Sequence, residues 1–209
     1  MFNSLLSIFF SFCLIVIAGC KADSIEIKLS DADIQDAIDG EEVDVDFEAQ
    51  FSLLGELDEE GRVDLDRLVS IVRGYVELED VELESELMGV KVLVEGSIPI
   101  SASELENSPW FIKVSQWDDE QLRVELATGS SFPELADLMG DVNFLLSADP
   151  YHPIKYKLKA KGSLVTAPAV EINGRTYLLY RETVDKRITM NFSGGPYDNV
   201  GGGFLIRLP

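Results

Sequence analysis

The residues of this chain with the most definite chemistry are its two cysteines, Cys13 and Cys20. Both thiols lie within or close behind an apolar segment, residues 5–18, that contains no charged residue. The segment is shorter than the run of about 20 apolar residues that a membrane-spanning helix needs. Its length is that of the core of a removable signal peptide. If residues 1–19 are removed, Cys20 becomes the first residue and the only thiol of the exported chain, which must then fold without disulfides.

The residues that end this segment, Ile17-Ala18-Gly19-Cys20, resemble the lipobox of bacterial lipoprotein precursors. The resemblance implies cleavage before Cys20, a diacylglycerol on its sulfur and a further acyl chain, such as palmitate, on the new amino terminus. Two or more acyl chains anchor a protein stably to a membrane. In lipoproteins of bacteria with two membranes, Asp after the acylated cysteine commonly retains the protein in the inner membrane. Lys21 at this position implies the outer membrane, on its periplasmic face. The alternatives are an uncleaved anchor and an ordinary secretory signal.

A second feature is a run of alternating lysines near the middle of the second half. The four side chains would lie on one face of one strand, because neighbouring strand residues point to opposite faces. They form a basic stripe of Lys155, Lys157, Lys159 and Lys161. The stripe is interpreted as a solvated face or as a cross-strand partner of acidic strands. The alternative is a surface for lipid head groups, anionic glycans or a partner protein.

The net charge of −21 is concentrated in the first half of the chain. Residues 21–110 contain 6 Lys and Arg against 26 Asp and Glu, whereas residues 111–209 contain 11 against 12. We interpret this as a solvated acidic face, with a docking surface for a basic partner or a loose surface for divalent cations as the alternatives. Nucleic acid is not expected as a partner, because its phosphates would be repelled.

Residues 56–67 resemble a calcium-binding EF-hand loop in their alternating acids and central Gly61. However, Glu56 stands at the first position and Arg67 stands where the bidentate glutamate is needed, so the segment is interpreted as an acidic turn and no metal site is predicted. His152, the only histidine, lies between two prolines and is interpreted as a surface turn residue. Nucleotide-binding, nucleophile-elbow and zinc-protease motifs are absent from the sequence, so neither a cofactor nor enzymatic activity is expected.

Alternation of apolar and polar residues predicts many antiparallel strands. Their ranges are 25–29, 43–51, 76–87, 90–100, 110–117, 121–127, 142–147, 154–160, 169–172, 175–180, 187–192 and 204–208. Met88-Gly89 and Asn173-Gly174 mark hairpin turns, the second requiring positive φ angles. Helices are predicted after the N-cap Ser30 as far as Gly40, over about 65–72 and over 132–139.

These elements predict an α+β fold, mainly antiparallel β, with one or more curved sheets and two or three short helices. After a signal peptide of residues 1–19, residues 20–209 are expected to form a single envelope-exposed domain with a possible subdivision near 101–109. The expected function is that of a non-catalytic, membrane-tethered lipoprotein that binds or assembles an amphiphile or a protein. The alternatives are an inhibitor or immunity lipoprotein that engages a basic enzyme through the acidic half, and a cryptic hydrolase.

Overall fold

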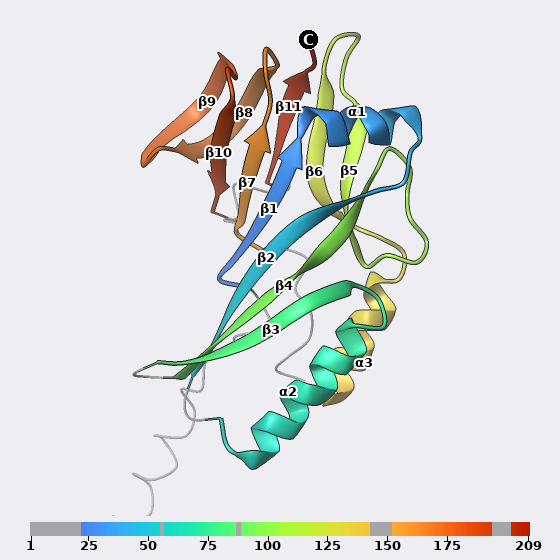
Figure 1. The fold of residues 1–209 in the computed structure, drawn as a ribbon, viewed down its shortest axis with the longest axis vertical. Helices are drawn as coiled ribbons and strands as arrows, with labels where there is room; N and C mark the ends of the chain where they lie inside the picture. Colours follow the sequence, from blue (N-terminus) through green and yellow to red (C-terminus); the bar gives the residue numbers. More distant parts are fainter. Residues whose placement is uncertain (1–21, 55–56, 87–88, 143–151, 194–201) are drawn as a thin grey trace, which may run out of the picture.

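A computed structural model describes residues 22–54, 57–86, 89–142, 152–193 and 202–209 (Figure 1). The described part contains three helices, α1 (Asp31–Asp39), α2 (Glu59–Val72) and α3 (Phe132–Val142). It also contains eleven strands: β1 (Ser24–Ser30), β2 (Val43–Leu54), β3 (Glu77–Glu86), β4 (Gly89–Ser101), β5 (Trp110–Gln116), β6 (Leu122–Thr128), β7 (Ile154–Lys159), β8 (Leu164–Ile172), β9 (Arg175–Thr183), β10 (Arg187–Phe192) and β11 (Gly203–Arg207). The prediction of a mainly β protein with two or three helices is confirmed. The strand predicted over residues 142–147 begins inside α3 and otherwise lies outside the described residues.

The strands form one sheet that closes on itself. Its order is β10-β7-β1-β2-β4-β5-β6-β11-β8, and β8 pairs again with β10, so that nine strands complete a ring. Two pairs, β1 with β7 and β4 with β5, are parallel and all other pairs are antiparallel. A curved sheet was expected, but its closure into a barrel-like ring was not. Closure removes the exposed edges of these nine strands. In the described chain, β3 pairs only with β4 and β9 only with β8, so each keeps one edge of the sheet.

Side chains fill the interior of the barrel. Tyr156 on β7 is fully buried, and its ring makes edge-to-face contacts with Phe192 and Phe204, at centroid distances of 5.9 and 5.3 Å. Its hydroxyl accepts a hydrogen bond of 2.9 Å from the backbone N–H of Leu126 on β6, a strand that is not its neighbour in the sheet. Burial raises the pKa of this hydroxyl. Tyr156 therefore connects two walls of the barrel through its centre.

Helix α1 lies at one end of the barrel (Figure 1) and buries Ile34 and Ala37 in the core. Ser30 is its N-cap as predicted, and Ser30 and Asp33 form a reciprocal capping box. Gly40 ends the helix with φ of 85°, a left-handed conformation that glycine adopts without strain. The Asn173-Gly174 turn between β8 and β9 is also confirmed, with φ angles of 52° and 74°.

The strands β2 and β4 are longer than their neighbours and, with β3, run out of the barrel as a twisted arm (Figure 1). Helices α2 and α3 pack against each other beside this arm through Leu68, Leu135 and Met139. Residues 102–109 connect β4 to β5, which are neighbours in the same sheet. The subdivision expected near this connection stays a prediction.

Candidate protein-binding surface

Acidic side chains from three adjacent strands lie directly opposite one another on the outer face of the arm. Glu95 on β4 is paired in register with Glu48 on β2 and with Asp80 on β3. Residues directly opposite in an antiparallel pair share a face, with Cβ atoms about 5 Å apart. Three carboxylates therefore form one row across the arm. Like charges in this arrangement destabilise a sheet.

The same register places further acids on this outer face, above and below the row. We call the whole set the acidic face, which consists of Asp44, Asp46 and Glu48 on β2, Glu95 on β4, and Glu77, Asp80, Glu82 and Glu84 on β3. A β-bulge at Glu79 brings Asp80 opposite Glu95. Sequence reasoning identified the acidic strands from their alternation but did not single out Glu95, because the pairing of β2, β4 and β3 decides its neighbours.

Few basic side chains neutralise the acidic face. Lys28 forms an ion pair of 2.6 Å with Glu48, and Lys91 one of 3.5 Å with Glu84. The hydrogen bond and charge of Glu48 raise the pKa of Lys28. Within the described ranges, the other six carboxylates of the face form no ion pair shorter than 4.0 Å. The arm therefore carries uncompensated negative charge toward solvent.

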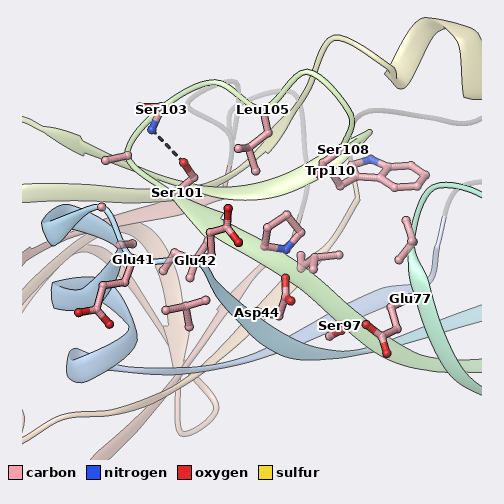
Figure 2. A pocket seen from close by; sticks show the side chains of 18 of the residues that line it. Glu41, Glu42, Asp44, Glu77, Ser97, Ser101, Ser103, Leu105, Ser108 and Trp110 are labelled. Carbon is pink, nitrogen blue, oxygen red and sulfur yellow. Dashed lines mark hydrogen bonds between the residues drawn. The ribbon is translucent and has the colours of Figure 1, made fainter.

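An open groove adjoins the acidic face where β2 and β4 enter the barrel. Its volume is about 580 Å³, and its walls come from the end of α1, β2, β4, the start of β3 and the connection before β5. Figure 2 shows the carboxylates of Glu41, Glu42, Asp44 and Glu77 around it, with Trp110 at one end. The groove thus joins acidic groups to an aromatic wall, which suits the charged tip and the apolar stem of a lysine or arginine side chain.

The structure divides the predicted basic stripe. Lys155 and Lys157 both form ion pairs with Glu26 on β1, the first at 2.6 Å. Burial raises the pKa of Glu26, but the hydrogen bonds and charges of the two lysines outweigh it, and the pKa lies below its ordinary value of 4.5. Lys159 ends β7, and Lys161 lies beyond the strand, where its backbone N–H donates to Asp31. Lys155 and Lys157 are therefore cross-strand partners of an acidic residue, which is one of the interpretations considered from the sequence.

Two interpretations from the sequence were wrong. His152 is buried rather than exposed, and its Nδ1 accepts a hydrogen bond of 2.9 Å from the backbone N–H of Ala22. This hydrogen bond joins two segments far apart in the sequence, so the prolines on either side of His152 give no indication of it. Residues 59–67 are the first part of α2 and not a turn, because Asp58 caps the helix by accepting from the N–H of Gly61 at 2.8 Å. Acidic residues in a first turn suit the helix dipole.

The remaining features considered from the sequence are the lipobox, a metal site and a membrane-spanning helix. Cys20 and the lipobox lie outside the described residues. Where the chain is described, no set of three or more His, Cys, Asp or Glu side chains is arranged to hold a metal ion. None of the helices described is both long and apolar enough to cross a bilayer.

No protein-family model matches the chain, and a search of curated proteins gives no match.

Proposed function

We propose that this protein is a lipid-tethered envelope lipoprotein without catalytic activity, and that it binds a basic protein partner through the acidic face and the adjoining groove. The observation that carries the proposal is the row of Glu48, Glu95 and Asp80. A folded protein gains nothing in stability from three opposed carboxylates, since their repulsion costs free energy. A partner that supplies lysine or arginine would relieve that repulsion on binding.

The tether is proposed from the sequence. Cleavage before Cys20 and acylation of its thiol would leave the chain on the membrane, and Lys21 supports the periplasmic face of the outer membrane. The proposal is tested by mass spectrometry of the protein extracted from membranes. A chain that begins at Cys20 with its acyl chains supports the tether, and an intact, unmodified amino-terminal segment contradicts it.

The two kinds of partner considered from the sequence make different demands on the fold. An amphiphile would need apolar space, and the centre of the barrel is occupied by Tyr156 and the aromatic rings around it. A basic protein needs exposed negative charge with a hollow for a side chain, and the arm offers both. The protein partner is therefore the better supported of the two.

Inhibition of a basic enzyme is the second candidate, because it would use the same acidic face. An activity assay on a basic enzyme, for which a muramidase is a suitable example, separates the two functions. Loss of muramidase activity on adding the protein, restored by charge reversal at Glu95, supports an inhibitor, whereas unchanged activity leaves an assembly or adaptor role.

The surface can be mapped by NMR with a ten-residue lysine peptide as the probe. We expect saturable chemical-shift changes in β2, β3, β4 and the groove, and their loss in high salt, since the Debye length falls from about 10 Å at 0.1 M to about 3 Å at 1 M. Shifts of equal size over the whole molecule, or shifts centred on another surface, would contradict the proposed site.

A further inference from the structure

The most exposed apolar side chains of the described residues lie together on β9. Leu178 is 91% exposed and Leu179 is 63% exposed, although they are consecutive residues of a strand. Their flanking residues Tyr177 and Tyr180 are instead half-buried, with ring centroids 5.3 Å apart. The alternation of buried and exposed residues is also broken in the paired strand β8, at Ala169, which has a φ angle of 46°. Both leucines therefore face solvent.

Two arginines flank this leucine pair. Arg175 and Arg181 are exposed on the same strand. The β8–β9 hairpin has no net charge, because Glu171 and Glu182 balance these two arginines, in a chain of net charge −21. Exposed leucines between tyrosines and arginines are the composition of a membrane interface site: leucine enters the acyl region, tyrosine lies at the boundary and arginine contacts lipid phosphates.

The β8–β9 hairpin lies near the amino-terminal end of the described chain. A small hollow of about 270 Å³ is lined by Ser24 on β1 together with Ala169, Glu171 and Thr176 of the hairpin. Ala22 is buried, and His152 holds its backbone. Only Lys21 separates Ala22 from Cys20, so two residue steps of about 3.5 Å each span the distance from barrel to tether. Acyl chains on Cys20 would keep this end of the barrel at the bilayer surface.

We propose that the β8–β9 hairpin is a second membrane contact, in which Leu178 and Leu179 insert into the bilayer interface and Arg175 and Arg181 bind anionic lipid phosphates. This inference rests on the membrane location in the proposed function, but it does not depend on the chemistry at Cys20. It also orients the barrel, because two contacts fix its tilt and a single point of attachment does not. The acidic face belongs to other strands and stays available for a partner.

The test uses the mature chain, residues 20–209, with Cys20→Ser, which has no other cysteine. A Leu179→Cys variant is labelled with an environment-sensitive fluorophore and mixed with vesicles of phosphatidylethanolamine and phosphatidylglycerol in a ratio of about 3 to 1. We expect a blue shift and increased emission. Leu83→Cys is the matched control, because Leu83 is an exposed leucine, 46% exposed, on the acidic arm. Equal responses at the two positions, or none at Leu179→Cys, would overturn the proposal.

Affinity for the same vesicles gives a second readout. Leu178→Ser with Leu179→Ser should lower the partition coefficient by at least about tenfold, given the area of two leucine side chains. Both side chains are exposed, so the variant should fold, and circular dichroism verifies this. Unchanged partitioning overturns the membrane contact. A blue shift of the label that appears without vesicles and increases with protein concentration also overturns it, and indicates instead that two copies of the chain pair through this strand. Glu95→Lys in the same background tests the acidic face alone and should not reduce vesicle binding, so the two proposals fail separately.

Discussion

Replacing Glu95 should stabilise the protein while weakening its binding. Two charges about 6 Å apart interact by about 0.7 kcal/mol at the dielectric constant of water. Glu95 has two such neighbours, Glu48 and Asp80. Screening at physiological salt, with a Debye length of about 8 Å, removes roughly half of the sum. Lys28 also neutralises part of the charge of Glu48. Glu95→Gln should therefore raise the free energy of unfolding by about 0.5 kcal/mol, and Glu95→Lys by about 1 kcal/mol.

Urea denaturation at several salt concentrations measures this effect. The midpoint of Glu95→Gln should exceed that of the wild type, with an unchanged slope, and the difference should shrink toward zero at 1 M salt. Asp185→Asn is the matched control, since Asp185 is an exposed acid beside Lys186 and Arg187, and its removal should not stabilise the protein.

The reasoning is refuted if Glu95→Gln destabilises the protein at low salt, or if its effect equals that of Asp185→Asn. Either result would mean that the three carboxylates do not repel one another as the register requires. A gain in stability accompanied by full binding of the lysine peptide would instead preserve the electrostatics and contradict the proposed site.

Three further predictions concern the fold. Glu26→Gln should lower the free energy of unfolding by about 1 kcal/mol at neutral pH, because it leaves two adjacent lysines unpaired. The pKa of Glu26 is lowered in the folded state, so its contribution is complete above pH 4.5 and is lost as the pH falls through the folded-state pKa, and the difference between the two proteins should vanish in acid. A difference in urea midpoint that does not change with pH would contradict this. Ser30→Ala should cost about 1 kcal/mol by removing the N-cap of α1, whereas Ser30→Asp should retain most of the stability in the same measurement. Tyr156→Phe should cost about 1 to 3 kcal/mol, because the N–H of Leu126 loses its acceptor inside the barrel; a thermal midpoint equal to that of the wild type would show that this hydrogen bond adds nothing.

Local structure was predictable wherever a single segment contains the whole signal. Ser30, the acids that follow it and Gly40 are sufficient to define α1, and Asn173-Gly174 is sufficient to define the β8–β9 turn. Alternation predicted β2, β3 and β4 and the antiparallel pairing of the last two. Met88 of the predicted turn lies outside the described residues. The start of α2 was missed, because its first turn is acidic and resembles a loop until Asp58 is recognised as its cap.

Long-range arrangement was not predictable, because it depends on pairings between distant segments. The parallel contact of β1 with β7, which gives Glu26 its two lysines, joins residues more than a hundred positions apart. The hydrogen bond from Ala22 to the buried His152 is of the same kind. The acidic face also required the register of three strands and the bulge at Glu79. Composition indicated an acidic half, and only the register shows that its carboxylates oppose one another.

The central claim, that the acidic face binds a basic protein, is tested most directly by photo-crosslinking in cells. A photoreactive amino acid in place of Glu82, which is exposed on β3, is compared with the same substitution at Asp185 on the opposite half of the sequence. We expect one discrete adduct with a protein of positive surface charge from position 82, none from position 185, and loss of the adduct when Asp46→Lys and Glu95→Lys are added. An adduct that survives these two charge reversals, or equal adducts from both positions, would contradict the account.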